Sequence, residues 1–369
     1  MSKSISAQIS ELGVSIWLDD LSKDRITSGS LAELVKQHNV VGITSNPTIF
    51  AQAIGTDGSY NFDIKELAGK GLSSEEIALE LMIRDVRLAC DQMAGVFAES
   101  GGSNGLVSLE VSPLLSQNAQ STISQAEEIW KSVDRPNLMV KIPATESCLP
   151  AITETIGSGI NVNVTLIFSI DRYQSVLDAY FSGIELALSR RIDITQIRSV
   201  ASFFVSRLDS AVDKLLDNLN SKSAAELRST AAVANARLAY DLFEEAHRSE
   251  RAASLFDSGM NIQRPLWAST GVKDPKLPET HYVVELAGPN VVNTMPEKTL
   301  LALSSLRDSP VDRISGSSNG ARDALKSIER EGIALEHVTK ALESAGLEQF
   351  VSSWHELLNR IKLAMESTT

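Results

Sequence analysis

Short apolar runs alternate with amphipathic stretches along most of the chain, and the two patterns predict different elements. The apolar runs are rich in Val, Ile and Leu, as strands buried on both faces are. Eight such runs occur, at 14–19, 40–44, 106–110, 138–141, 160–166, 197–202, 262–268 and 291–295. Pro143 is expected to stop the fourth of these strands, because proline cannot donate a hydrogen bond to a neighbouring strand.

Amphipathic stretches separate most of these strands and predict helices. Ser30 with Glu33 and Ser73 with Glu76 form the S-x-x-E signature of a helix start. Further helical stretches are predicted at 73–100, 119–133, 171–189 and 224–256. Two shorter helices are also predicted, one that starts at about 48 and one that ends at 157. Strands that alternate with helices predict a parallel sheet, and eight such units close most simply into a (β/α)8 TIM barrel. We therefore expect an α/β fold in which residues 1–369 form one barrel domain with helical insertions.

The chain ends in a predicted helical tail that starts at about 320. Within 335–365 the apolar residues recur at helical spacing, namely at Val338, Leu342, Leu347, Phe350, Trp354, Leu357 and Ile361. Such a stripe indicates either ordinary core packing or a dimer face, and the sequence leaves both open. The Ser- and Gly-rich segment 308–319 is predicted to be a flexible connection into this tail.

Composition narrows the class of protein. The chain has 369 residues, 43% of them hydrophobic, so it can bury a large core. Its net charge of -13 opposes nonspecific binding to nucleic acid or to an anionic membrane. No apolar run reaches the length of a membrane span and the first residues lack the apolar core of a signal peptide, so a cytoplasmic location is expected. Cys90 and Cys148 fit a reducing compartment and are expected to be buried.

One lysine stands out because it follows an apolar run. Lys141 comes directly after Leu138, Met139 and Val140, at the carboxyl end of a predicted buried strand. A solvated lysine at this place would be an ordinary surface charge. Burial disfavours the ammonium form and can lower a lysine pKa by up to about 3 to 5 units, which leaves a neutral amine that attacks carbonyl carbons. The surrounding residues must decide between these two interpretations.

Polar side chains occupy the carboxyl ends of the predicted strands, which is where barrels of this kind carry reactive groups. They are Asp19, Thr44, Asn46, Glu110, Lys141, Asn163, Thr165, Ser202 and Ser269. Any one of them alone is more often a loop cap than a functional group. Together they predict a polar cup around the lysine amine.

The motifs of several other enzyme classes do not occur in the sequence. There is no G-x-G-x-x-G after a strand, no G-x-x-x-x-G-K-[ST] and no G-x-S-x-G. The histidines have no paired ligand spacing and are scattered, at His38, His247, His281, His337 and His355. The sequence therefore predicts no metal site.

Five segments carry a resemblance to a known family. They are TSNPT at 44–48, LEVSP at 109–113, VKIPAT at 140–145, INVNVTLIFS at 160–169 and SFFVSRLD at 202–209. Over about residues 14–296 the chain resembles transaldolase, and WASTGVKDP from Trp267 is similar to the longer bacterial form of that family. The resemblance implies a class I aldolase-type barrel that moves a dihydroxyacetone unit between sugar phosphates in the pentose phosphate pathway, without metal or cofactor.

The resemblance also implies catalytic roles. Lys141 would form a Schiff base with the C2 carbonyl of fructose 6-phosphate or sedoheptulose 7-phosphate. Asp19 would take the proton of the C4 hydroxyl as the C3–C4 bond breaks. Glu110 and Thr165 would position water and move protons while the imine forms.

Substrate-binding positions follow from the same resemblance. Thr44, Asn46, Asn163 and Ser202 resemble the residues that hold the three-carbon enamine by hydrogen bonds. Phe204 resembles the apolar lid over the site.

Two features depart from the shorter members of the family. Asp20 lies beside Asp19, so either acid could be the base, although alternation along the first strand favours Asp19. Shorter members have an arginine for the substrate phosphate close after the serine at position 269, and Lys273 is the nearest cation here. We expect Arg207, Ser269 and Lys273 to converge on the phosphate at the barrel mouth.

Two other functions are compatible with a barrel and a lysine. A Schiff-base aldolase would cleave fructose 6-phosphate and release free dihydroxyacetone, and Glu110 favours transfer over that reaction. A barrel without catalysis would act as a scaffold, which the lysine and two acids oppose. The expected partners are small sugar phosphates, with no nucleic acid and no membrane, and the chain is expected to be a monomer or homodimer.

Overall fold

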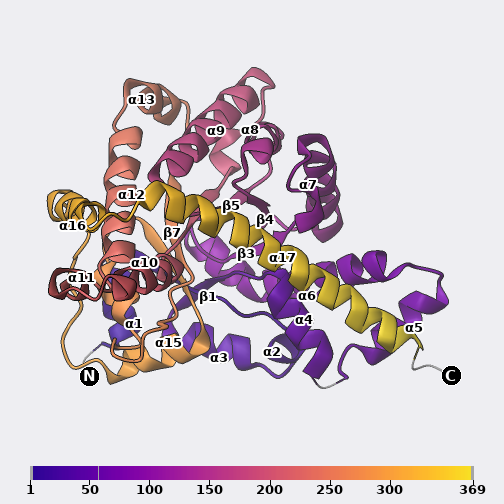
Figure 1. The fold of residues 1–369 in the computed structure, drawn as a ribbon. Coiled ribbons are helices and arrows are strands. Elements are labelled where there is room, and N and C mark those ends of the chain that lie inside the picture. Colours follow the sequence, from indigo (N-terminus) through magenta and orange to yellow (C-terminus); the bar gives the residue numbers. More distant parts are fainter. Residues whose placement is uncertain (1–2, 57, 367–369) are drawn as a thin grey trace.

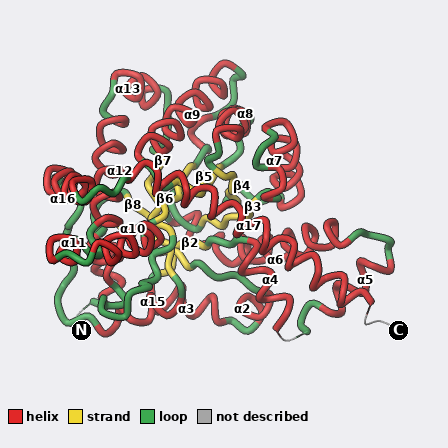
Figure 2. The backbone as a smooth tube through the Cα atoms, in the orientation of Figure 1, coloured by secondary structure: helices red, strands yellow, loops and turns green. Residues whose placement is uncertain are grey.

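The computed structural model describes residues 3–56 and 58–366, and its centre is a closed barrel of parallel strands (Figure 2). Each strand pairs with the next one in sequence, and the last pairs with the first. The strands are β1 (Val14–Leu18), β2 (Val40–Ile43), β3 (Leu106–Glu110), β4 (Leu138–Pro143), β5 (Val162–Ile167), β6 (Ser199–Phe204), β7 (Gln263–Ala268) and β8 (Val291–Met295). The predicted (β/α)8 barrel is therefore confirmed.

Helices cover the outside of the barrel (Figure 1). In chain order they are α1 (Ile5–Glu11), α2 (Lys23–Thr27), α3 (Ser30–His38), α4 (Pro47–Thr56), α5 (Asn61–Gly69), α6 (Ser74–Glu99), α7 (Ala119–Val133), α8 (Leu149–Gly157), α9 (Ile170–Ser189), α10 (Ser206–Leu219), α11 (Lys222–Glu226), α12 (Ala231–His247), α13 (Glu250–Asp257), α14 (His281–Glu285), α15 (Glu297–Ala302), α16 (Ser318–Arg330) and α17 (Leu335–Glu366). The segment predicted as helical over 224–256 divides into α11, α12 and α13.

The two predicted helix-start signatures differ in outcome. At α6 the Ser73 hydroxyl accepts a hydrogen bond from Glu76 N, and the Glu76 carboxylate accepts one from Ser73 N, so the capping box is present. At α3 the helix begins at Ser30 itself, and the capping position belongs to Gly29 in a left-handed conformation. The helix was predicted correctly there, but its capping box was wrong.

The predicted start of the sixth strand was wrong because side chains bind its backbone groups. β6 begins at Ser199 and not at 197, because Ile197 O accepts a hydrogen bond from the Asn261 amide and Arg198 N donates to Asn161 Oδ1. These backbone groups are therefore occupied by side chains. Pro143 is the last residue of β4, as predicted, although Ala144 still donates its N–H to Thr165 O of β5 at 2.7 Å.

Large apolar side chains fill the barrel interior below its mouth. Trp17, Met139, Val200 and Leu266 belong to one buried cluster that lies inside the ring of strands. Gly42 makes room for the Trp17 indole, because a Cβ at that position would lie 2.3 Å from the ring. The barrel is thus a packed core between two polar ends: the carboxyl-end mouth, and the amino end, where Arg264 of β7 donates to Ser15 of β1 at 2.7 Å.

The last helix, α17, crosses the mouth of the barrel, and Figure 1 shows it running over β5, β4 and β3 toward α4, α5 and α6. The predicted stripe faces inward: Phe350, Trp354, Leu357 and Ile361 are buried, and the earlier members pack partly buried against the core. The core-packing alternative is therefore confirmed for this stripe. The connection predicted over 308–319 ends earlier, because α16 begins at Ser318.

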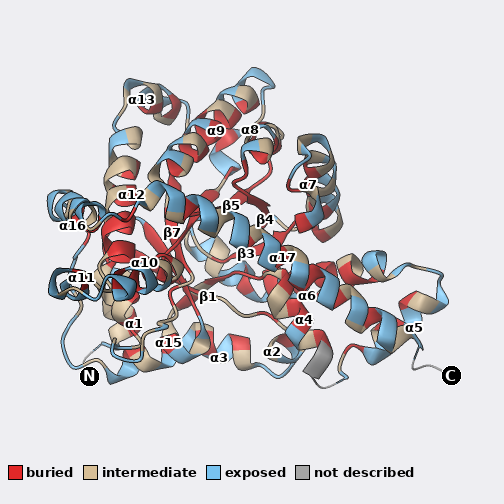
Figure 3. Cartoon of the chain, viewed as in Figure 1, coloured by how far each residue is buried: buried red, intermediate tan, exposed pale blue. Residues whose placement is uncertain are grey.

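Burial follows the layers of the fold (Figure 3), with buried strands at the centre and exposed outer helix faces. Cys90 and Cys148 are free and buried, as predicted. Among the described residues, no helix combines the length and the apolar character that a bilayer crossing requires.

Candidate active site

A cavity of about 200 Å³ opens at the carboxyl ends of the strands, beneath α17. Most of the polar residues singled out in the sequence line it together. The predicted residues in its wall are Asp19, Thr44, Asn46, Lys141, Ser202, Phe204, Arg207, Ser269 and Lys273. These side chains come from strands β1, β2, β4, β6 and β7 and the loops after them, so the closed barrel is what brings them to one place.

Lys141 lies on β4 and is only 5% exposed, so it is not a solvated strand-end lysine. Its Nζ donates a hydrogen bond to Ser45 O at 3.2 Å and lies 3.4 Å from Glu110 Oε2. The apolar residues on either side of it, Val140 and Ile142, point outward into the helix layer. Alternation along β4 thus directs the amine into the cavity, where a carbonyl carbon can reach it.

Glu110 sits beside Lys141 because β3 and β4 pair in register at these two residues. The carboxyl is 5% exposed, and burial raises its pKa to about 7, although the neighbouring ammonium of Lys141 opposes the shift. A carboxyl with such a pKa exchanges protons readily near neutral pH. It can therefore act both as an acid and as a base toward groups on the amine.

Replacing Glu110 with glutamine should change how stability depends on pH. The folded chain binds this proton more tightly than the unfolded chain, whose carboxyl has a pKa near 4.5, so the contribution is full below that pH and is lost as pH rises through about 7. Glutamine does not titrate. The melting temperature of Glu110→Gln, relative to that of the wild type, should therefore rise as the pH increases from about 5 to about 8. A difference that is constant with pH, or equal to that of the surface variant Glu128→Gln, would contradict this.

Asp19 follows β1 and lines the same cavity as Lys141. Thr44 donates its hydroxyl to Asp19 Oδ1 at 2.8 Å. Burial raises the pKa of this carboxyl, while the charge of Lys141 and the Thr44 hydrogen bond act in the opposite direction. An acid with these neighbours can take a proton from a hydroxyl bound near the lysine.

Asp20 points away from the lysine into an ion pair. Arg25 donates to Asp20 Oδ2 from Nε at 2.9 Å and from a terminal nitrogen at 2.5 Å, and the same guanidinium binds Glu297. Asp20 is not among the residues that line the cavity. The geometry therefore favours Asp19 over Asp20 as the acid that reaches a substrate.

Three predicted residues do not line the cavity but lie next to those that do: Glu110, Asn163 and Thr165. Asn163 pairs with Lys141 in the β4–β5 register, accepts from the Ser202 hydroxyl at 2.7 Å and donates to Ser108 at 3.0 Å. Thr165 Oγ1 is buried and has no hydrogen-bond partner within the part of the chain that the structure describes. Its hydroxyl is thus available to a group at the lysine.

Two cations, Arg207 and Lys273, line the cavity from the segments that follow β6 and β7. Arg207 is in the first turn of α10, with its guanidinium 5.3 Å from the Phe204 ring centroid. Its sequence neighbour Asp209 does not pair with it but accepts hydrogen bonds from Tyr282 OH and Ala232 N. Burial disfavours the charged form of Arg207 and so lowers its pKa, although the charge of Asp19 opposes this shift. An anionic group bound beside the guanidinium would therefore be favourable.

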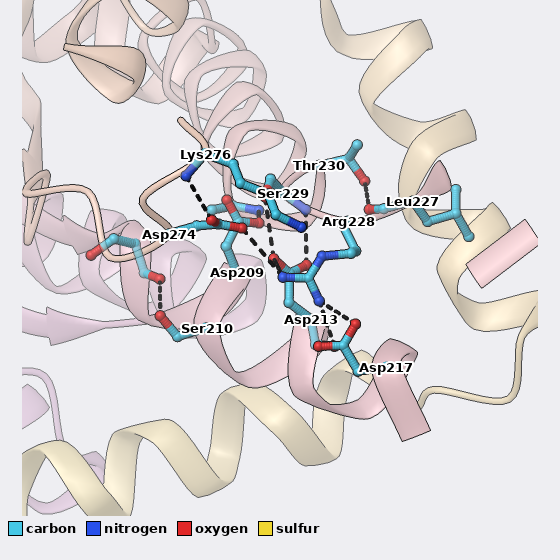
Figure 4. A network of polar contacts seen from close by, with 12 residues as sticks. Asp209, Ser210, Asp213, Asp217, Leu227, Arg228, Ser229, Thr230, Asp274 and Lys276 are labelled. Atoms are coloured by element: carbon cyan, nitrogen blue, oxygen red, sulfur yellow. Dashed lines mark hydrogen bonds and ion pairs between the residues drawn. The ribbon is translucent and has the colours of Figure 1, made fainter. Parts of the chain in front are cut away.

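A network of ion pairs holds the loop that carries Lys273 (Figure 4). Arg228 lies 3.3 Å from Asp274 in this loop and also pairs with Asp213 and Asp217 on α10. Asp274 further accepts from Lys276 N at 2.9 Å. The exposed Lys273 therefore extends from a loop whose base is tied to α10, the helix that begins beside Arg207.

Sequence reasoning missed several cavity residues: Gly271, Thr294, Pro296 and Phe350. Thr294 lies on β8 and shares a 2.6 Å hydrogen bond with Thr44, so the polar strand-end pattern could have found it. Phe350 comes from α17, and its spacing in the tail gave no sign of a place at the barrel mouth.

A larger cavity of about 860 Å³ lies beside the site, between α9, α12, α16 and α17. Its wall carries charges of both signs, including Arg172, Lys326, Glu329 and Glu343, and it does not include Lys141 or the other predicted residues. Among residues 3–56 and 58–366, no group of three or more His, Cys, Asp or Glu side chains could hold a metal ion. The reactive groups thus gather in the smaller cavity.

Comparison with known proteins connects this geometry to a family. The family model described as transaldolase/fructose-6-phosphate aldolase matches residues 16–361, a range that includes every residue lining the cavity. The chain is 47% identical to a transaldolase of Thermobifida fusca over 362 residues, which are 98% of each chain. It is 50% identical to transaldolase 2 of Streptomyces coelicolor over 351 residues (95% of this chain and 94% of that protein) and 50% identical to a transaldolase of Renibacterium salmoninarum over 362 residues (98% and 97%).

Proposed function

The chain belongs to the transaldolase/fructose-6-phosphate aldolase family, and we propose that it is a transaldolase of the pentose phosphate pathway. As a transferase it moves a dihydroxyacetone unit from fructose 6-phosphate or sedoheptulose 7-phosphate to glyceraldehyde 3-phosphate or erythrose 4-phosphate. The observation that carries this proposal is the buried Lys141 amine 3.4 Å from Glu110, in a cavity that Asp19 also lines.

The reaction begins with imine formation at Lys141. The amine adds to the C2 carbonyl of the donor sugar, and loss of water from the adduct leaves an iminium. Glu110 supplies and removes the protons of this step, because its pKa of about 7 allows both directions at neutral pH. Thr165, whose hydroxyl is free of other contacts among the described residues, orients the water that leaves and later returns.

Bond cleavage follows at the next carbon. Asp19 takes the proton of the C4 hydroxyl, the C3–C4 bond breaks, and its electrons flow into the iminium to give a neutral enamine and an aldose phosphate. In the second half of the cycle the enamine C3 attacks the aldehyde carbon of the acceptor. The protonated Asp19 returns its proton to the new C4 oxygen, and water then releases the product from Lys141.

The three-carbon enamine must stay bound between these two halves. Thr44, Asn46 and Ser202 offer hydroxyl and amide groups on the cavity wall. Asn163 lies next to this wall and accepts a hydrogen bond from the Ser202 hydroxyl. Phe204 supplies an apolar surface beside them. The chemistry uses side chains alone and needs neither metal nor organic cofactor.

Acceptor-dependent turnover tests this function. Purified protein with fructose 6-phosphate and erythrose 4-phosphate should form sedoheptulose 7-phosphate and glyceraldehyde 3-phosphate in equal amounts. Rapid consumption of fructose 6-phosphate without an acceptor, with release of free dihydroxyacetone, would favour the aldolase alternative. Light scattering on the same preparation tests the accompanying proposal that the chain is a monomer or homodimer.

Arg207, Ser269 and Lys273 are proposed to bind the substrate phosphate. Arg207→Ala should weaken the use of fructose 6-phosphate by about 1.5 to 3 kcal/mol in kcat/KM, the scale of a hydrogen bond to a charged group. Lys273→Ala should have a smaller effect, because this side chain is exposed and its charge is screened by water.

Unphosphorylated fructose provides the control for these two variants. Its slow turnover should be unchanged, because it has no phosphate for Arg207 to bind. An equal loss for both donors would mean that the arginine supports the fold or the chemistry instead. The phosphate site would then lie elsewhere.

A further inference from the structure

Phe350 is the residue that covers the reactive amine. Its ring centroid lies 5.7 Å from Lys141 Nζ, and the side chain is only 4% exposed. Together with Phe204 it makes the aromatic part of the wall of a cavity that the polar residues Asp19 and Thr44 also line. The amine therefore lies between a polar wall that can handle protons and an apolar cover that offers none.

The helix that carries Phe350 is held on both sides of it. On the amino-terminal side, α17 packs so closely on the barrel that a Cβ at Gly346 would lie 3.1 Å from Leu166, and Glu343 pairs with Arg172 of α9 at 3.3 Å. On the carboxyl-terminal side, the Ser353 hydroxyl shares a 2.7 Å hydrogen bond with Thr48 of α4. The ring is thus fixed over the lysine by contacts of α17 to the barrel, to α9 and to α4.

We propose that Phe350 determines whether the enamine is transferred to an aldehyde or lost to water, an inference that rests on the proposed function. The enamine has two fates. In transfer, C3 forms a bond to the acceptor aldehyde carbon, and the aldehyde oxygen takes the proton held by Asp19. In loss, C3 takes a proton from water, the resulting iminium is attacked at C2 by water, and dihydroxyacetone leaves as Lys141 regains its amine.

An apolar cover slows the step that is specific to loss. That step is the transfer of a proton from water to C3, whereas in transfer C3 attacks the aldehyde instead. Water attacks C2 only afterwards, in the hydrolysis that ends both fates. Expelling water from a closed site is a general means of preventing hydrolysis of reactive intermediates. On this proposal the Phe350 ring, whose centroid lies 5.7 Å from Nζ, keeps water from reaching C3.

Two substitutions separate water exclusion from other roles of the ring. Phe350→Ala removes the cover, and the ratio of dihydroxyacetone released to acceptor converted should rise about tenfold, which is about 1.4 kcal/mol between the competing barriers. Phe350→Leu keeps an apolar side chain without a π-face, and its ratio should stay close to that of the wild type. Leu363→Ala, on the exposed face of the same helix at 66% exposure, is the matched control and should leave the ratio unchanged.

The measurement is made on full-length protein with fructose 6-phosphate, with and without erythrose 4-phosphate. Thermal unfolding of each variant shows that the fold is retained. An unchanged ratio in Phe350→Ala, with transfer and release reduced together, would overturn the inference. A rise in the leucine variant as large as in the alanine variant would also overturn it, because an apolar cover would then not be what protects the enamine.

Failure of this inference can be told apart from failure of the proposed function. The wild type must first show acceptor-dependent transfer and a borohydride-trapped adduct on Lys141. If the wild type transfers but Phe350→Ala keeps its ratio, only the role of Phe350 fails. If the wild type itself releases dihydroxyacetone without an acceptor, the transaldolase assignment fails first.

Discussion

Lys141→Met should abolish transfer, with kcat falling by at least about 10⁴-fold, the scale on which loss of the nucleophile acts in other covalent enzymes. The thioether cannot form an imine, so the variant lacks the electron sink that cleavage of the C3–C4 bond requires. Lys273 is the other lysine in the cavity wall, but it is exposed and lies on a loop, whereas Lys141 is buried beside Glu110. The two lysines therefore form a natural pair for comparison.

Borohydride trapping provides the measurement. With fructose 6-phosphate, wild-type protein and Lys273→Met should both acquire a reduced three-carbon unit on the peptide that contains Lys141, and Lys141→Met should acquire none. Methionine leaves the buried Glu110 without its ion-pair partner, so thermal unfolding must accompany the assay. An adduct on Lys273, or on any peptide of Lys141→Met, would refute the assignment of the nucleophile.

The barrel could be predicted from the sequence because its determinants are local. Each strand is a short run of apolar residues, and alternation with helices leaves few topologies for eight such units. Strand ends failed where a distant side chain decides them, as Asn261 and Asn161 do at the start of β6. Their amides occupy backbone groups that the apolar pattern of Ile197 and Arg198 would assign to the sheet.

The candidate site divides in the same way. Residues at strand ends, such as Asp19 and Lys141, could be found because the topology alone brings strand ends together. The choice between Asp19 and Asp20 needed alternation, and in the structure it is Arg25 that draws Asp20 away. Phe350 could not be found, because its place over the lysine depends on the path of α17 across the mouth, which periodicity within the helix does not encode.

Asp19→Asn and Glu110→Gln should each lower turnover by about 10² to 10⁴, the usual range for losing a general acid or base, but at different steps. Asparagine cannot take the C4 proton, while Lys141 and Glu110 remain as they were. The imine should therefore form normally and stop before cleavage. Borohydride should then trap the whole six-carbon sugar phosphate on Lys141 in Asp19→Asn, in place of the three-carbon unit.

Glu110→Gln should show the opposite defect. Glutamine cannot exchange protons with the adduct at C2, so trapping itself should be slow, and what is trapped should be the three-carbon unit because Asp19 still cleaves the bond. Asp20→Asn is the matched control for both variants, since it loses an ion pair to Arg25 outside the cavity and should turn over almost normally. If Asp20→Asn accumulates the six-carbon adduct and Asp19→Asn does not, the base is Asp20. Asp19, which accepts a hydrogen bond from the Thr44 hydroxyl, would then only order the cavity wall.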